Sequence, residues 1–409
     1  MVSSSQSRPQ NWLKLFDLHQ FGTAFTCTVG VICCLAYATT QKPCSRIRWV
    51  MLVPTIGLAL TTAYSVLEVQ AFPPLRTVVG FTLGVCLALE SINHLCVRRT
   101  FIDLKKTPCG RYTIHNALYQ GADLVFNKRS IRTPYQVKGV PMFNSKNPSY
   151  VPSRSRFLVL RTARILVLNV VCSVLLSEPA PEVLSICRPV SRVAFPIRLV
   201  QGNVSVTEYI NRFILTLGFL TFTILIQLAG YDEVSVIGVG LLNNDPADWP
   251  PRFDSITTAY NIRRFWNTFW HQDLRALLTC FANLVSDNVL RLPKRGVLQR
   301  YTKIYLCFGI SGLLHIYGDK LGNVSLSETG VLWFFLHSAT GILIEDLVKA
   351  VYHWAFTDRG FTSYGVGQPP RWQKILGYMW TLFYLTLVTP QWACPFMTGK
   401  MPKMPGLPV

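Results

Sequence analysis

The chain has 409 residues, of which 50% are hydrophobic and only 15% are charged. In soluble domains about a quarter of the residues are charged, so this composition excludes an ordinary soluble protein. The net charge of +20 would suit a nucleic-acid partner, but the basic residues lie between apolar runs. No zinc-finger spacing or other nucleic-acid module accompanies them. We therefore expect the basic loops to face anionic lipid headgroups, and we expect no nucleic-acid partner.

Apolar runs of roughly 18–22 residues recur along the chain, and this length is sufficient to cross the hydrocarbon core of a bilayer. They predict an all-α, polytopic membrane protein. The first three spans are expected at about 21–38, 49–66 and 77–96. The connection 97–156 carries twelve Lys and Arg residues against two acidic residues. The positive-inside rule places this connection in the cytosol and segment 1–20 on the lumenal side.

A fourth span is expected at about 157–176, and it contains two arginines, Arg161 and Arg164. Since both lie in its first two turns, we expect their side chains to extend back to the cytosolic headgroups. The Pro-rich segment 177–207 is then lumenal. A fifth span at about 209–229 returns to the cytosol, and the apolar stretch 231–242 is expected to dip into the membrane without crossing it.

Polar residues interrupt segment 274–290, which is therefore predicted to be interfacial or re-entrant. Further spans are expected at about 304–317, 331–351 and 375–393, which gives eight or nine in total. Near the cytosolic end of the span 331–351, Glu345 and Asp346 are expected to pair with Lys or Arg residues of the loops.

Two Asn-Val-Ser patterns begin at Asn203 and Asn323, and both fall on the predicted lumenal side as candidate N-glycosylation sites. The twelve cysteines form no Cys-x-x-Cys pair, and most of them lie in apolar runs, where cysteine behaves as a small hydrophobic residue. We expect neither a disulfide framework nor a metal site.

One helical face of the span 304–317 carries Cys307, Ser311 and His315, which are spaced four residues apart. An ionisable side chain at membrane depth indicates a functional site. Histidine suits proton abstraction because its ordinary pKa lies near neutrality. The alternative is a structural histidine that is hydrogen-bonded to a backbone carbonyl.

A second motif, 263–275, is rich in aromatic residues. As a helix it would place Arg264, His271 and Arg275 along one stripe, and Phe265 and Phe269 along another. The alternative is an aromatic belt, in which tryptophan rings anchor the protein at the headgroup level. A belt does not require four packed rings together with an arginine pair and a histidine.

Together these motifs resemble the wax synthase branch of the membrane-bound O-acyltransferase superfamily. That branch shows Trp-Pro-Pro-x-Phe, then an FWxxxWHQxxR block, then a span with Ser-Gly-x-x-His. Where the middle of the block is commonly basic, this chain has Asn267-Thr268-Phe269. The matching residues are Trp249, Pro250, Pro251, Phe253, Phe265, Trp266, Trp270, His271, Gln272, Arg275, Ser311, Gly312 and His315.

The resemblance implies that His315 is a general base, which takes a proton from a substrate hydroxyl while the oxygen attacks an acyl-CoA thioester. It implies that His271 is the second catalytic residue, and that the transmembrane helices surround an intramembrane reaction chamber. No metal or redox cofactor is expected, since acetyl-CoA or another acyl-CoA is the co-substrate. The residues expected to bind substrates are Trp266, Trp270, Arg275, Ser311 and Asn267.

In length and in its long basic connection, the chain resembles fungal members of this branch. The predicted function is therefore transfer of acetyl from acetyl-CoA to a hydroxyl of a terpenoid or meroterpenoid secondary metabolite. The partners would be acyl-CoA, a hydrophobic alcohol and membrane lipid, and the expected location is the endoplasmic reticulum. The alternatives are a long-chain (wax ester) or sterol O-acyltransferase and, outside the acyltransferases, a polytopic transporter.

The predicted organisation follows the motifs. It consists of a lumenal segment 1–20, four spans in 21–176 with the basic cytosolic loop 97–156, a lumenal loop, fifth span and connector in 177–248, an acyltransferase core in 249–393 and a tail 394–409. A prenyltransferase is disfavoured because the acidic cluster of Asp245 and Asp248 is single and poorly spaced for binding diphosphate.

Overall fold

The computed structural model describes residues 18–68, 80–107, 109–175, 181–187, 198, 200–357 and 369–398. Throughout these residues the regular elements are helices and there is no strand, which confirms the predicted all-α fold. The predicted segments 1–20 and 394–409 lie largely outside the described residues. The chain forms two compact units, one of Met1–Phe126, Lys320–Asn323 and Pro402–Val409, and the other of Asn127–Asp319 and Val324–Met401.

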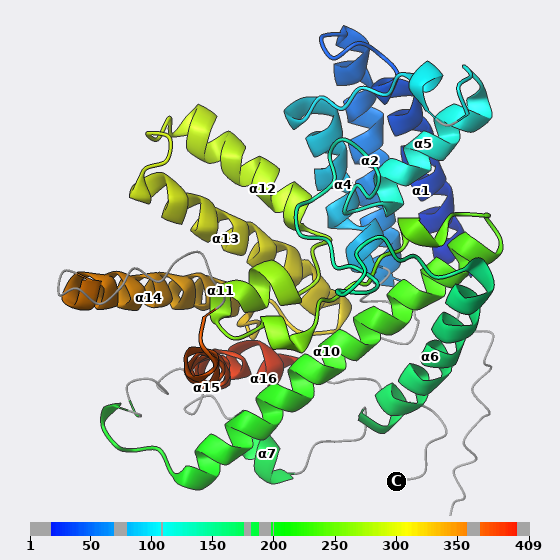
Figure 1. Cartoon of the computed structure of the whole chain (residues 1–409). Helices are drawn as coiled ribbons and strands as arrows, with labels where there is room; N and C mark the ends of the chain where they lie inside the picture. Colours follow the sequence, from blue (N-terminus) through cyan, green and yellow to red (C-terminus); the bar gives the residue numbers. More distant parts are fainter. Residues whose placement is uncertain are drawn as a thin grey trace, which may run out of the picture. The chain divides into compact units, whose positions relative to one another are not determined.

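The first unit is built on two long apolar helices of similar length, α1 (Leu18–Thr39) and α2 (Arg46–Glu68), which pack along each other. The helix α4 (Val85–Ile92) packs on α2 and continues into a π-helical turn, and α5 (Ile114–Phe126) packs on α1 (Figure 1). Arg48 is buried and donates to backbone carbonyls of His94 and Thr100, so it joins α2 to the residues that follow α4.

In the second unit, α6 (Arg154–Leu175) packs on α10 (Val206–Gly240), as Figure 1 shows. The side chain of Ser205 caps α10 by accepting from the Glu208 amide. This helix has 35 residues and is roughly 52 Å long at 1.5 Å per residue. The predicted division into a span 209–229 and a separate stretch 231–242 is therefore wrong, because the helix continues through Gly230, the residue between the two segments.

A buried ion pair between α6 and α10 overturns a second expectation. Arg161 and Arg164 both donate to Asp232 of α10, whose side chain has no exposed surface. The Arg161 side chain is only 7% exposed, so the prediction that it extends to the headgroups is wrong. A carboxylate in an apolar interior requires paired donors, and two turns of α6 supply them.

The rest of the second unit consists of short helices and three longer ones, α13, α14 and α15. Segment 274–290 is helical and is divided into α12 and a π-helical turn, and the predicted span 375–393 is interrupted at Thr389 between α15 and α16. The elements are α7 (Pro181–Ser185), η4 (Pro246–Asp248), η5 (Ile256–Thr258), α11 (Ile262–Arg264), η6 (Phe265–Phe269), α12 (Arg275–Asn283), η7 (Leu284–Val289), α13 (Val297–Leu321), α14 (Val331–Thr357), α15 (Arg371–Val388) and α16 (Pro390–Thr398).

Five helices of the described chain are long and apolar enough to cross a membrane, which identifies a membrane protein. They are His19–Thr39, Arg46–Glu68, Gly80–Val97, Val206–Gly240 and Val331–Tyr352. Three other helices, α6, α13 and α15, have 22, 25 and 18 residues and correspond to the remaining predicted spans. These three do not meet the combined criterion of length, apolarity and low charge that the five meet, so the total of eight or nine spans stays a prediction.

One disulfide bond joins Cys187, just after α7, to Cys394 in α16, with Cα atoms 5.0 Å apart. The sequence did not indicate this pair, because 207 residues separate the two cysteines and only the fold brings them together. The bond ties α16 to the segment that precedes α10.

Candidate active site

The aromatic block begins where a short helix, α11, is capped twice. The Asn261 side chain accepts from the Arg264 amide, and Glu345 of α14 accepts from the Ile262 amide at 2.5 Å and the Arg263 amide at 3.2 Å. Glu345 therefore binds backbone amides and the Trp380 indole rather than the predicted Lys or Arg. Its neighbour Asp346 pairs with Arg263 and Arg300, as predicted. These contacts attach the block to α14.

The Trp-Pro-Pro segment is held by arginines from distant parts of the chain. Arg129 donates to the carbonyls of Pro250 and Pro251 at 2.9 and 2.7 Å, and Arg161 donates to the Trp249 carbonyl at 3.1 Å. Gly238 of α10 lets the Trp249 ring approach, since a Cβ atom there would lie 2.6 Å from it. Three consecutive carbonyls are thus satisfied by guanidinium groups, which fixes the entry to the aromatic block.

A continuous run of ring contacts joins the two predicted catalytic histidines. From His315 it passes to Phe335 at 4.6 Å between ring centroids, and from Phe335 to Trp266 at 5.8 Å. Trp266 contacts Trp270 at 5.3 Å, and Trp270 contacts His271 at 5.8 Å. Both histidines therefore belong to one aromatic cluster of the second unit.

His315 lies on α13, where its Nδ1 is 2.7 Å from the backbone carbonyl of Ser311. Because a carbonyl only accepts, Nδ1 donates, and Nε2 is the unprotonated nitrogen of the neutral ring. A structural histidine would make the same bond, so the bond alone does not choose between the two alternatives that the sequence left open. Its chemical consequence is the tautomer, which leaves Nε2 as the basic atom.

The carboxylate of Asp273 lies close to His271 and to two arginine side chains. It pairs with Arg252 at 2.7 Å and lies 3.8 Å from Arg129 and 3.9 Å from His271 Nδ1. Burial lowers the pKa of His271 to about 3; the Asp273 carboxylate opposes this shift, and the positive charge of Arg252 adds to it. Burial alone would raise the pKa of Asp273, but the surrounding cations outweigh it and hold that pKa below its ordinary value. His271 is thus neutral near pH 7, and Asp273 is ionised.

Of the predicted substrate-binding residues, Trp266 and Trp270 lie within the aromatic cluster, and Ser311 is buried on α13. Arg275 donates to the backbone carbonyls of Lys138 and Asn267, so it joins the basic connection to the block. The Asn267 side chain is exposed, and the fold does not bring it into the cluster.

Several residues of this region were not predicted. Asp273 stands only two positions after His271, but its role depends on cations from elsewhere in the chain. The charge of the basic connection and the apolarity of the spans do not indicate which of their side chains reach this region. The unpredicted residues are Arg129, Tyr231, Arg252, Asp273, Asp319, Phe335 and Trp392.

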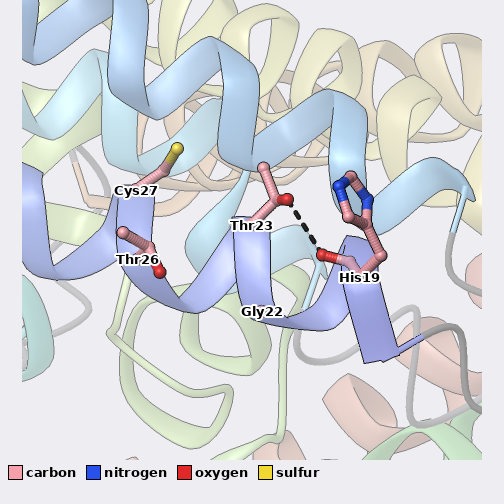
Figure 2. A pocket seen from close by; sticks show the side chains of 5 residues that line it. All are labelled: His19, Gly22, Thr23, Thr26 and Cys27. Atoms are coloured by element: carbon pink, nitrogen blue, oxygen red, sulfur yellow. Dashed lines mark hydrogen bonds between the residues drawn. The ribbon is translucent and has the colours of Figure 1, made fainter.

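An open hollow of about 440 Å³ lies along α1 in the first unit and is lined by His19, Gly22, Thr23, Thr26 and Cys27 (Figure 2). The Thr23 hydroxyl donates to the His19 carbonyl within the same helix. A hollow formed by one helix, whose ionisable side chains are one histidine and one cysteine, does not assemble groups for catalysis. Among the described residues there is also no cluster of three His, Cys, Asp or Glu side chains that would bind a metal.

Comparisons with known proteins agree with this geometry. The family described as membrane bound O-acyl transferase matches residues 249–337, which contain both histidines. Acetyltransferase spyB of Aspergillus fumigatus is 32% identical over 300 residues, covering 69% of this chain and 48% of spyB. Acetyltransferase ataH of Aspergillus terreus is 37% identical over 179 residues, covering 44% and 56%. The chain thus spans about half the length of these two relatives.

Acetyltransferase nanB of Aspergillus nanangensis is 30% identical over 301 residues, which cover 68% of each chain. No solved structure matches the chain. The shared length with nanB and the match of the motif region agree with each other, and the chain belongs to the membrane-bound O-acyltransferase family.

Proposed function

We propose that the protein is an O-acetyltransferase that moves the acetyl group of acetyl-CoA to a hydroxyl of a terpenoid or meroterpenoid secondary metabolite. The observation that carries the proposal is that His315, with its tautomer fixed, lies in one aromatic cluster with His271. The hydrogen bond from Nδ1 to Ser311 leaves Nε2 unprotonated in the aromatic cluster. A neutral imidazole of fixed orientation is the group that a general base requires.

In this mechanism, Nε2 of His315 takes the proton of the acceptor hydroxyl while the oxygen attacks the thioester carbonyl carbon. The carbon–oxygen bond forms, and the carbonyl oxygen becomes an oxyanion. When the oxyanion collapses, the carbon–sulfur bond breaks, and the CoA sulfur takes the proton back from His315. The products are an acetyl ester and CoA, and the histidine returns to its neutral state.

His271 is the second residue of this proposal. Its Nδ1 is buried and makes no hydrogen bond within the described chain, and the same is true of the Trp266 indole Nε1. Buried polar atoms are seldom left unpaired, so these two atoms are suited to binding the reacting groups of a substrate. Asn267 has less support in this role because its side chain is exposed.

An acetyl donor is favoured over a long-chain donor by the close surroundings of His315. Rings of Phe335 and Trp392 lie 4.6 and 5.3 Å from its imidazole, and Phe335 itself packs against Phe308 and Trp266. A two-carbon acyl group needs little room beside such rings. The relatives named above are themselves acetyltransferases by name. The apolar rings also suit a hydrophobic alcohol as acceptor.

For the location we propose the endoplasmic reticulum. A disulfide bond such as Cys187–Cys394 persists in an oxidising compartment. In the predicted topology both cysteines fall on the lumenal side, together with Asn203 and Asn323, whose side chains are exposed. The basic connection and the aromatic block then face the cytosol, where acetyl-CoA is available.

The proposal is tested with microsomes from cells that produce the full chain. They are incubated with labelled acetyl-CoA or labelled palmitoyl-CoA and with a panel of terpenoid, sterol and fatty alcohols. We expect a labelled acetyl ester of a terpenoid alcohol. Exclusive use of palmitoyl-CoA would instead favour the wax ester or sterol acyltransferase, and release of no ester from either donor would contradict acyl transfer.

A further inference from the structure

The surroundings of Asp273 contain more positive than negative charge. Arg252 pairs with this carboxylate at 2.7 Å, and Arg129 lies 3.8 Å from it. Lys128 is near enough for its charge to help lower the pKa of Asp273. Two guanidinium groups thus lie within 4 Å of one carboxylate, in a place where the Arg129 side chain is only 3% exposed. Excess charge away from water is unfavourable unless an anion compensates it.

The burial of the Arg129 side chain is explained by its contacts within the fold. Its two terminal nitrogens donate to the carbonyls of Pro250 and Pro251 and to the Tyr231 hydroxyl. Its guanidinium also lies over the Tyr231 ring, 5.3 Å from the centroid. These contacts account for its burial without a ligand.

Lys128 and Arg252 are not explained in this way. The Lys128 ammonium nitrogen is buried and makes no hydrogen bond or ion pair with the described residues. The Nε of Arg252 is likewise buried and without a hydrogen-bond partner, although the other end of its guanidinium binds Asp273 and Gln227. The Lys128 ammonium and the Arg252 Nε–H, which come from separate segments, thus both lack a hydrogen-bond acceptor within the described chain. Buried charged donors of this kind require an acceptor.

We propose that Lys128 and Arg252 form a binding site for the phosphate groups of the acyl-CoA donor. This proposal rests on the proposed function. It pairs Arg252, inside the family match at 249–337, with Lys128 of the basic connection, which lies outside that match. Lysine is a common phosphate ligand as a point charge, and an arginine Nε–H adds a directed donor. The diphosphate and the 3′-phosphate of CoA supply the missing negative charge. Since His271 also lies beside Asp273, the site would place the CoA moiety near the second histidine.

The test uses the full chain purified in detergent, with binding of CoA and of pantetheine, which lacks phosphate, measured by calorimetry. The variants are Lys128→Met and Arg252→Gln. The matched control is Lys146→Met, because Lys146 is an exposed lysine of the same connection. We expect each site variant to weaken CoA binding on the order of tenfold and to leave pantetheine binding unchanged, since a hydrogen bond to a charged group has about that effect.

Lys128→Met also has an expected effect that a purely structural lysine would not show. Removing an unpaired buried charge should raise the melting temperature of the CoA-free protein, while the stabilisation by added CoA should decrease. A lower melting temperature without ligand, with CoA binding unchanged, would overturn the proposal.

Other outcomes are equally decisive. Equal losses of CoA and pantetheine binding would overturn the phosphate site, because they would place these residues against another part of the donor or in the fold. Wild-type affinity for CoA in both variants would also overturn it and would leave acetyl transfer untouched. A wild-type protein that binds CoA through Lys128 but forms no acetyl ester would contradict the proposed function and support the site.

Discussion

Trp392 of α16 packs edge-on against His315 of α13, with ring centroids 5.3 Å apart, and its indole nitrogen donates to Asp319 at 2.8 Å. Asp319 lies one turn after His315 and is only 4% exposed. A single tryptophan thus contacts the proposed base and satisfies the buried carboxylate on the same helix. The disulfide at Cys394 fixes the helix that carries this tryptophan.

The first prediction concerns the hydrogen bond of Trp392. Trp392→Phe keeps an aromatic ring beside His315 but removes the donor to Asp319, whose remaining side-chain donor is the Thr329 hydroxyl. We expect a loss of about 1–3 kcal/mol in the free energy of unfolding, because a buried acceptor loses one partner. Thermal and denaturant unfolding in detergent measure this loss. The control is Trp333→Phe, a tryptophan that is 61% exposed, and equal stabilities of the two variants would contradict the role of the bond.

The second prediction concerns the disulfide. Cys394→Ser should lower the free energy of unfolding by about 2–5 kcal/mol, the usual cost of losing a native disulfide. It should also lower acetyl transfer, because α16 carries Trp392. Cys109→Ser, at an exposed free cysteine, is the control and should behave as wild type. Peptide mapping without reductant should find the peptides of Cys187 and Cys394 linked, and two free thiols at these positions would show that the bond does not form.

The third prediction concerns the pairing of α6 with α10. Asp232→Asn leaves Arg161 and Arg164 without their carboxylate in a buried place, and it should cost about 3–5 kcal/mol in the free energy of unfolding. Glu233→Gln, one position further along α10, is the control and should have a small effect. If Asp232→Asn is as stable as Glu233→Gln, then Arg161 and Arg164 find other partners, as the sequence-based prediction of contact with headgroups would require.

The fourth prediction concerns pH and His271. Its pKa is about 3 in the folded protein and lies near the ordinary 6.5 in the unfolded chain. Between these values the unfolded chain binds more protons, so stability is full above pH 6.5 and decreases as the pH falls toward 3. Melting temperatures measured across this range should therefore decline more steeply for wild type than for His271→Gln. Parallel curves for the two proteins would contradict the buried, neutral state of His271.

Much of the fold could be predicted because membrane spans are encoded in composition. The apolar runs that predict helices at 21–38, 49–66 and 331–351 coincide with α1, α2 and α14, since length and apolarity alone determine such helices. The joining of 209–229 and 231–242 into α10 was not predicted. The buried pairing of Asp232, which lies in the second of these stretches, with Arg161 and Arg164 of α6 depends on contacts that the sequence does not reveal.

The candidate site was predictable where chemistry is local. The motif positions identified His315, His271, Trp266 and Trp270, and the fold gathers them in one cluster. Contacts that join distant segments were not predictable. The bonds from Arg129 to the Trp-Pro-Pro carbonyls and from Trp392 to Asp319 depend on side-chain directions that spacing does not reveal.

The most direct test of the account is the rate of acetyl ester formation by His315→Ala in microsomes, with acetyl-CoA and an accepted alcohol. Loss of a general base should reduce this rate on the order of 10²–10⁴-fold, while the amount of inserted protein stays equal to wild type. His337→Ala is a suitable control, because this histidine of α14 is hydrogen-bonded to Gln391 and has no role in the proposed reaction. A wild-type rate in His315→Ala would show that His315 is structural and would contradict the proposed mechanism.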